Sequence, residues 1–552
     1  MTAWFDPFPL VSTGLQVLVS ELIGTRSDYR VIESFGSPQP PYDFSKEEEI
    51  WFDYVADVGD GWNSTYTIAT LLARDSLSVS AGVHDPENVQ TRRGRILIMG
   101  GDEVYPLASR DNYQEKLVAP YECANVGSKS QAAIFAIPGN HDWYDGLISF
   151  TRLFCQSRDI GSWQTMQRRS YFAIQLPHRW WLWGVDIQLE SDLDRPQVDY
   201  FRSIAEKMQP GDRVIIATAE PDWIYGNIYD PNLQKNLAFL EETLIRGQAR
   251  AKLQITIAGD LHHYRRHEAA DGSRVQLITA GGGGAFLHPT IGQPVDTIRI
   301  GADRDREFTL RESFPSQQIS RLLLLRNFLF PLYNPKFGIL GGAVYLVIVW
   351  TLGLWVKSDD EAAFFRNILE SPAAAFCIAS VVLVFVAFTD THDRVYKYLA
   401  GSLHGVAHLF GCIVSGRIAG DILQISANRP IPLPKFIAAA SIVFGAGYVI
   451  SSLLMGGYLY ISLQVFQRHA NEAFSALHIE DYKNFIRMHI NKQGKLTMYP
   501  IGVKKVPKRW KPTESSSNNP RYDPTDREIE PFLIEKPVEI IGEPDHSEGP
   551  NQ

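Results

Sequence analysis

One stretch of sequence, AIFAIPGNHD over residues 133–142, indicates the fold class. Its first five residues are apolar, and a proline and a glycine end the run, which is the pattern of a short buried strand. The residues that follow, Asn140, His141 and Asp142, can bind metal ions or transfer protons. Because ligand sites in layered α/β folds form at the carboxyl ends of strands, the stretch predicts an α/β domain with a site at that edge.

Three other apolar runs end in the same way. Residues 52–56 lead into Asp57, residues 95–99 (RILIM) into GGDEVY at 100–105, and residues 253–258 (LQITIA) into GDLHHY at 259–264. An aspartate after a strand is often only a cap or turn residue, but four such ends in order argue for a shared site. Carboxylate, amide and imidazole groups suit Mn, Fe, Zn or Mg ions.

Taken in order, these motifs resemble the calcineurin-like metallophosphoesterase family over about residues 50–290, and the GDxxY pattern at 101–105 is similar to that of its purple acid phosphatase branch. The resemblance implies a four-layered α/β/β/α sandwich and two divalent metal ions. It implies His141 as the acid or electrostatic group, oriented by Asp142, with Asp102 bridging the two ions. The metal ligands to which it points are Asp57, Asp102, Tyr105, Asn140, Glu220, Asp260 and His262.

The departures from the family pattern fall on the second ion. Ala219 stands where a histidine is expected, so that Glu220 next to it would have to supply an oxygen, and Asp260 replaces another histidine. Exchange of nitrogen for carboxylate oxygen favours Mn²⁺, Fe²⁺ or Mg²⁺ over Zn²⁺. The alternative is that the second site is weak or empty. The glycine run at 281–284 is either a wall of the site or a simple turn.

A different composition begins after Lys336. Residues 337–356, 371–389 and 436–466 carry no charge, and residues 398–424 form a weaker fourth run that contains His404 and His408. About 20 apolar residues in a helix cross the ~30 Å hydrocarbon core of a bilayer. The sequence therefore predicts an α-helical transmembrane bundle of about four helices after the α/β domain, although three spans remain open.

The distribution of Lys and Arg predicts the orientation of these spans. Basic residues precede the first run and follow the last, so four spans place both termini in the cytoplasm of a multi-pass cell-membrane protein. The first 24 residues lack a basic start and a small-residue cleavage site, and the four cysteines show no CxxC spacing, both of which agree with a cytoplasmic catalytic domain. A net charge of −9 argues against nucleic acid as a structural partner.

The predicted organisation has five parts. They are a lead-in (1–45), a catalytic domain (46–310), a helical membrane region (320–466), a small cap (467–511) and a disordered tail (512–552). Within the cap, residues 471–490 show helical apolar spacing, and residues 496–503 are expected to form a strand.

The leading functional hypothesis is a membrane-anchored phosphoesterase that cleaves a phosphomonoester or phosphodiester with metal-activated hydroxide, and a lipid-derived phosphate is one candidate substrate. A second hypothesis is a catalytically impaired sensor or scaffold, which Ala219 and Asp260 favour. A third is a metal or proton transporter in which His392, His404 and His408 act and the soluble domain regulates. Hydrogen bonding between helices is the simpler explanation for these histidines. The oligomeric state is left open.

Overall fold

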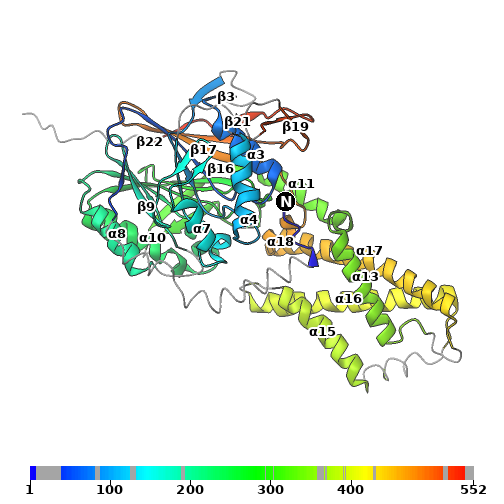
Figure 1. Cartoon of the computed structure of the whole chain (residues 1–552). Coiled ribbons are helices and arrows are strands. Elements are labelled where there is room, and N and C mark those ends of the chain that lie inside the picture. Colours follow the sequence, from blue (N-terminus) through cyan, green and yellow to red (C-terminus); the bar gives the residue numbers. More distant parts are fainter. Residues whose placement is uncertain are drawn as a thin grey trace, which may run out of the picture. The chain divides into compact units, whose positions relative to one another are not determined.

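The computed structural model describes residues 1–7, 39–80, 88–124, 132–187, 193–292, 294–301, 304–356, 366, 370–389, 391, 393–426, 430–513 and 520–540. The chain divides into two compact units (Figure 1). Unit 1 contains residues 1–2, 13–317 and 479–552, and unit 2 contains residues 3–12 and 318–478. Most of the predicted lead-in, and His392, lie outside the described residues.

Unit 1 is a mixed α/β structure with two large sheets. In the first sheet the strands lie in the order β1 (Tyr42–Asp43), β9 (Phe172–Leu176), β10 (Trp180–Gly184), β11 (Arg213–Ala217), β12 (Lys252–Ala258), β14 (Gln276–Ala280), β13 (Tyr264–Ala269), β16 (Arg306–Phe314) and β15 (Thr297–Ile300). Strands β10, β11, β12 and β14 run parallel, so their carboxyl ends lie at one edge of the sheet.

The second sheet contains the strands that precede Asp57, Asp102 and Asn140. Its order is β4 (Asn88–Arg92), β3 (Ser76–Ser80), β21 (Pro531–Leu533), β18 (Leu496–Val503), β17 (Lys483–Ile490), β2 (Ile50–Val55), β5 (Ile96–Met99), β6 (Ala132–Ala136), β8 (Trp163–Thr165) and β7 (Asp159–Ile160), and β22 (Val538–Ile540) also pairs with β18. Strands β2, β5 and β6 are parallel neighbours. Every residue of β5 and β6 is buried, as expected for short apolar strands covered on both faces.

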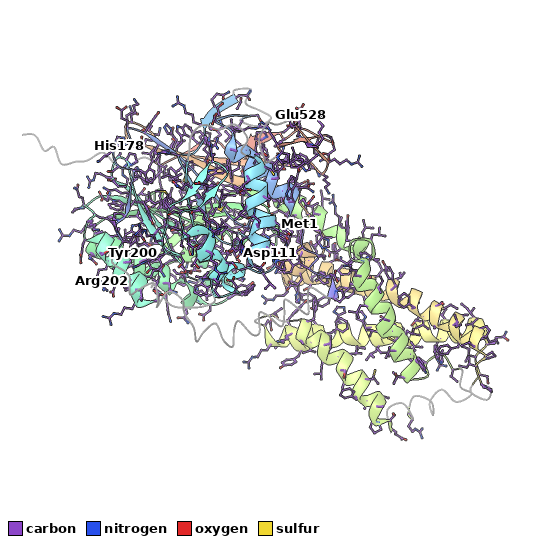
Figure 2. The ribbon with its side chains drawn as sticks, viewed as in Figure 1. Met1, Asp111, His178, Tyr200, Arg202 and Glu528 are labelled. Atoms are coloured by element: carbon purple, nitrogen blue, oxygen red, sulfur yellow. The ribbon has the colours of Figure 1, made fainter. Side chains whose placement is uncertain are left out.

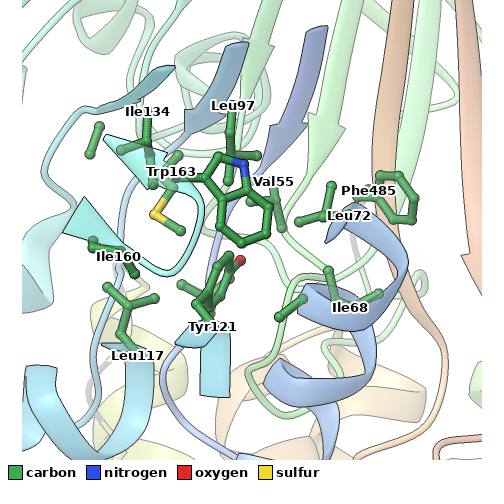
Figure 3. Packing of buried hydrophobic residues seen from close by; sticks show 14 of the residues in the cluster. Val55, Ile68, Leu72, Leu97, Leu117, Tyr121, Ile134, Ile160, Trp163 and Phe485 are labelled. Atoms are coloured by element: carbon green, nitrogen blue, oxygen red, sulfur yellow. The ribbon is translucent and has the colours of Figure 1, made fainter. Parts of the chain in front are cut away.

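The two sheets pack face to face. A single buried cluster joins Phe52, Ile98 and Phe135 of the second sheet to Ile174 and Ile255 of the first. The other face of the second sheet is covered by α3 (Trp62–Ala73), α5 (Ala119–Ala124) and α7 (Ile148–Phe154). Figure 3 shows residues of α3 and α5 packed around Trp163. The other face of the first sheet packs against α8 (Arg195–Ala205) and η3 (Leu240–Gln248).

Helix α8 shows how an outer helix is attached to its sheet. Asp194 caps its first turn by accepting a hydrogen bond from Gln197 N at 2.8 Å. Its Tyr200, labelled in Figure 2, accepts a hydrogen bond from Ala173 N of β9 at 2.9 Å. One polar contact and an apolar face therefore fix the helix on the sheet.

The segment that follows the long helices differs from the prediction. The expected helix over 471–490 is wrong, because α18 covers only Ala470–Ser475 and residues 483–490 form β17 between β2 and β18. Strand β18 lies at the predicted residues 496–503. A central strand buried on both faces shows no clean two-residue period, which explains why its apolar spacing looked helical.

The predicted disorder beyond residue 512 is wrong for residues 520–540. Strands β20 (Tyr522–Pro524), β21 and β22 lie there, and β21 and β22 pair with β18. Residues 514–519 and 541–552 lie outside the described residues. The second sheet is thus completed by residues far beyond the 46–310 range.

Unit 2 is helical. It contains most of α11 (Gln317–Leu324), then η4 (Leu325–Leu329), α12 (Phe330–Tyr333), α13 (Pro335–Thr351), α15 (Pro372–Phe388), α16 (Arg394–Leu423), α17 (Leu433–Phe466) and α18. Among the described residues, α16 and α17 are long and apolar enough to cross a membrane, and residues 317–351, bent by 61°, could form a third span. Helix α15 is apolar but shorter. A helix occupies each predicted segment, and four membrane crossings stay a prediction.

Candidate functional site

Three aspartates follow strand ends in the left-handed backbone region. Asp57, Asp102 and Asp260 have φ angles of +57°, +53° and +65°. Non-glycine residues seldom adopt this conformation, although aspartate tolerates it better than most, and such residues cluster at functional sites. The loops hold one another in place, because Asp57 N donates to Gly101 O at 2.9 Å and Asp260 N donates to Asp57 Oδ2 at 2.9 Å.

The hydroxyl group of Tyr105 lies among the side chains of three predicted ligands. Its oxygen is 2.9 Å from Asp57 Oδ1, 3.1 Å from Asp102 Oδ2 and 3.0 Å from His262 Nε2, so its one hydrogen can be donated to only one of these groups at a time. His262 Nε2 is also 3.4 Å from Asp57 Oδ1. The structure therefore brings together four predicted metal ligands from loops after β2, β5 and β12.

The separations within this cluster can be compared with those between ligands that share one metal ion. Ligands bound at about 2.0–2.2 Å in octahedral or tetrahedral geometry lie about 2.8–3.6 Å from one another. The three distances from the Tyr105 hydroxyl, and the distance between His262 Nε2 and Asp57 Oδ1, fall in that range. The described residues hold no group of three or more His, Cys, Asp or Glu side chains arranged to hold a metal ion, and a phenol stands among the acidic and imidazole donors instead.

The electrostatics of the cluster also favour a cation. Burial, and then the charge of Asp260, raise the pKa of Asp57 well above its usual value, and burial and the charge of Asp57 do the same for Asp102. Two buried carboxylates that contact the same hydroxyl group cannot both be ionised without a large free-energy cost unless a positive charge lies beside them. A metal ion bound between them would supply that charge.

His262 is arranged as a neutral nitrogen donor. Burial lowers its pKa to about 3, so the imidazole is uncharged at neutral pH. Its Nδ1 lies 2.7 Å from the carbonyl oxygen of Phe286, a contact that requires the proton on Nδ1. The lone pair of Nε2 is then directed at Tyr105 and Asp57, as in histidines that bind metals.

His141 is partly buried beside the cluster, and its backbone N donates to Asp102 Oδ1 at 2.9 Å. Its ring is held by a contact of 2.7 Å between Nδ1 and Pro106 O. Asp142, which was expected to orient this ring, instead accepts hydrogen bonds from Gly139 N at 2.8 Å and from the hydroxyl of Tyr113. Asp142 thus fixes the start of α6 (Asn140–Trp143), because the short helix needs an acceptor for its first N–H groups.

The residues expected to bind a second ion do not converge on one atom as three predicted ligands of the first ion converge on the Tyr105 hydroxyl. Asn140 Nδ2 donates to Tyr144 OH at 3.4 Å, and the Asp260 carboxylate accepts a hydrogen bond from Tyr225 OH. Glu220 lies in the turn between β11 and α9 (Asp222–Ile228), where its charge helps to raise the pKa of Tyr225. Ala219 lies against Gly101 and leaves an apolar wall there. The side chains of Asn140 and Asp260 therefore contact tyrosines rather than the hydroxyl of Tyr105.

The glycine run packs against the cluster. A Cβ atom at Gly281 would lie 2.4 Å from Asp57 Oδ2, and Gly283 N donates to Ala56 O at 2.9 Å. These contacts support the interpretation as a wall of the site, because the backbone must approach the carboxylate closely. His288 stacks on His262 with ring centroids 3.9 Å apart.

Two residues near the site were not singled out from the sequence as site residues. Lys483 of β17 is fully buried and donates to Ala285 O at 2.6 Å, and Glu103 is fully buried and accepts a hydrogen bond from Gly101 N at 3.1 Å. Glu103 could have been found, because it follows Asp102 directly in the GDEVY motif. Nothing local in the sequence connects Lys483 to a loop about 200 residues earlier.

Comparisons with known proteins add little to this geometry. No family model and no curated protein matches the chain. Among solved structures, it is similar to the purple acid phosphatase PPD1 from yellow lupin (Lupinus luteus) seeds, at 12% sequence identity and a TM-score of 0.26. The match covers 43% of this chain and 45% of the lupin chain, so the similar region spans less than half of either protein, and at this TM-score it does not define the fold.

Proposed function

We propose that unit 1 is a metal-dependent phosphoesterase with the four-layered α/β/β/α sandwich of the calcineurin-like family. The observation that carries the proposal is the convergence of Asp57, Asp102 and His262 on the hydroxyl of Tyr105. Buried carboxylates with raised pKa values, a neutral imidazole and a phenol form a donor set suited to Fe, Mn, Zn or Mg.

These four residues would hold the first ion. A bound divalent ion would supply a lowered pKa for a coordinated water molecule and would offset charge on phosphoryl oxygens. His141 is held by Pro106 and Asp102 at the edge of the cluster, where its imidazole can donate a proton or a hydrogen bond to the leaving oxygen of a phosphate ester. Burial lowers the pKa of His141, and its Nδ1–H is directed at Pro106 O, so the neutral ring presents an Nε2 lone pair and donates to the leaving oxygen only after Nε2 has taken up a proton.

The test is hydrolysis of p-nitrophenyl phosphate and bis-p-nitrophenyl phosphate by the full chain with added Mn²⁺, Fe²⁺ or Zn²⁺. The full chain is needed because β17 and β18 complete the sheet that carries Asp57. Asp102→Asn should lower turnover by about 10²–10³-fold, the scale seen when one electrostatic group is removed from a catalytic site. Asp111→Asn, at an exposed position on α4 (Arg110–Tyr113), is the matched control and should leave turnover unchanged.

A sensor or scaffold is the second candidate, and the engaged carboxylate of Asp260 favours it. A chain that binds one ion per molecule with no turnover of either ester would support the sensor and contradict the enzyme. Such a result would support the proposed metal site and contradict only the proposed catalytic activity.

We also propose that unit 2 anchors unit 1 to a cell membrane with its termini in the cytoplasm. The length and apolar composition of α16 and α17 support this location. Anchoring would raise the effective concentration of a lipid-derived phosphate ester near the site. Labelling of single cysteines from either side of sealed vesicles would test the orientation.

A further inference from the structure

Two histidines face each other among the apolar helices of unit 2. His404 and His408 are one turn apart on α16, and their Nε2 atoms are 3.2 Å apart. Each is only 4% exposed, and the ring of Phe385 lies 4.3 Å from each imidazole. At this distance one ring donates an N–H to the other, so the pair shares a single hydrogen between two nitrogens.

The pair continues into a third group that can both donate and accept. His408 Nδ1 lies 3.1 Å from the hydroxyl of Tyr345 on α13. At the other end, His404 Nδ1 is buried and has no hydrogen-bond partner among the described residues. Tyr345, His408 and His404 therefore form a hydrogen-bonded chain with an open end, which we call the histidine chain.

A second set of polar groups meets the histidine chain at its open end. The ring of Tyr458 on α17 stacks on His404 with centroids 4.2 Å apart. The Tyr458 hydroxyl lies 2.9 Å from Thr389 Oγ1 and 3.1 Å from His469 Nε2. His469 Nδ1 is 3.5 Å from a carboxylate oxygen of Glu472, whose side chain is 37% exposed. Polar groups thus extend from a partly exposed carboxylate to a buried tyrosine.

Structural bonding alone accounts poorly for this arrangement. A hydrogen bond between membrane helices contributes only modestly to stability. Burial of a nitrogen without a hydrogen-bond partner is itself unfavourable, so the open end at His404 offsets much of what the pair contributes. Ionisable groups in apolar helices commonly mark ion or proton pathways.

We propose that unit 2 conducts protons along a path from Glu472 through His469 and Tyr458 to the histidine chain. The proposal goes beyond the phosphoesterase activity and does not depend on it, although it requires unit 2 to lie in a membrane. The ligand of this path is the proton, and water completes it at two points, between Tyr458 and His404 and beyond Tyr345.

Each transfer leaves the histidine chain neutral. At the start, His404 Nε2–H donates to His408 Nε2, and His408 Nδ1–H donates to Tyr345. Water on the Tyr458 side passes a proton to His404 Nδ1. The proton on Nε2 of His404 then moves to Nε2 of His408, and the proton on Nδ1 of His408 moves to the hydroxyl oxygen of Tyr345. Tyr345 releases its own proton to water, so within the chain three bonds to hydrogen form and three break, and one proton enters as another leaves. Both imidazoles end in the opposite tautomer, and they must regain their first tautomers before the next proton enters.

The test uses the full chain in sealed lipid vesicles that contain a pH-sensitive dye, with a potassium diffusion potential to drive proton uptake. The native chain should take up protons faster than protein-free vesicles. Tyr345→Phe and Tyr458→Phe each remove one hydroxyl and should reduce uptake to the protein-free level. Tyr448→Phe is the matched control on α17, because its hydroxyl donates to Pro331 O at 2.9 Å outside the path, and it should conduct like the native chain.

Three results would overturn the proposal. The first is proton uptake by the native chain at the rate of protein-free vesicles. The second is uptake at the native rate in both Tyr345→Phe and Tyr458→Phe. The third is retention of one equivalent of Zn²⁺ or Cu²⁺ by the native chain that is lost in His404→Gln and His408→Gln, because this result would identify a metal site instead. The elution volume of each variant in detergent, measured by size-exclusion chromatography, separates loss of the path from loss of the fold.

Discussion

Arg487 and Asp53 form a buried ion pair in the centre of the second sheet. Arg487 Nε donates to Asp53 Oδ1 at 2.7 Å and its Nη2 donates to Asp53 Oδ2 at 3.1 Å, although the two residues are 434 positions apart. The arginine side chain is fully buried and the aspartate is 3% exposed. The pair joins β17, which follows the long helices, to β2, which leads into Asp57.

Removal of one partner should therefore destabilise unit 1. Arg487→Met leaves the Asp53 carboxylate buried without its cation and should lower the free energy of unfolding by about 3–5 kcal/mol. The double variant Asp53→Leu with Arg487→Met should lose clearly less than the sum of the two single changes. Denaturant unfolding followed by tryptophan fluorescence measures all three, and strictly additive losses would show that the pair is not coupled.

The tail beyond residue 520 should contribute to stability as well. Glu535 accepts hydrogen bonds from Tyr264 OH at 2.6 Å and from Arg266 Nε at 2.8 Å, and its side chain is 12% exposed. Glu535→Ala removes the acceptor of Arg266 Nε and Nη2 and leaves this arginine only its contacts with Gln276 and Glu268, and we expect a loss of about 2–3 kcal/mol. Glu528→Ala, on the exposed surface nearby, is the control. Equal unfolding midpoints for the two variants would contradict a structural role for the tail.

Lys483 should give the stability of unit 1 a characteristic pH dependence. Burial lowers its folded-state pKa to about 8, below the value of about 10.4 in an unfolded chain. Between these values the unfolded state binds more protons, so this residue makes stability rise with pH from about 8 to 10.4. Below pH 8 the cost of the buried charge is fully present, and above pH 10.4 it is gone.

The comparison with Lys483→Met isolates this contribution from other groups that titrate in the same range. Denaturant unfolding in the presence of a chelator, at pH 8 and pH 10, should show a larger gain of stability for the native chain than for the variant. Parallel pH profiles for the two proteins would mean that the pKa of Lys483 is not lowered in the folded state.

The strand ends that carry Asp57, Asp102, Asn140 and Asp260 could be predicted because each is a short local pattern. For Asp102, Asn140 and Asp260, an apolar run followed by glycine and a polar residue encodes both the strand and the turn, whereas Asp57 follows its run directly. The contribution of β17 could not be predicted in this way, since its position depends on Asp53 and Arg487 meeting across the sheet. The role of Asp142 could not be predicted from the sequence either. Tyr113, Gly139 and His141 are all possible donors to the Asp142 carboxylate, and only the fold decides which contacts form.

Two buried tyrosines near the cluster offer a sharp test of the candidate metal site. Tyr105 contacts Asp57, Asp102 and His262, whereas the hydroxyl of Tyr54 on β2 is equally buried but has no hydrogen-bond partner among the described residues. Tyr105→Phe and Tyr54→Phe remove the same atom from similar surroundings. If the cluster binds a metal ion, Tyr105→Phe should weaken binding by about 10–100-fold, the range found when groups that support metal sites are lost.

Metal content after dialysis against graded chelator, measured by elemental analysis, gives the affinity of each variant without relying on activity. Tyr54→Phe should bind like the native chain and unfold at the same denaturant concentration or a slightly higher one, because the change removes a buried polar group that has no partner. Equal metal affinities in the two variants would show that the Tyr105 hydroxyl only bridges the acidic loops, and the ion would then have to be held without it.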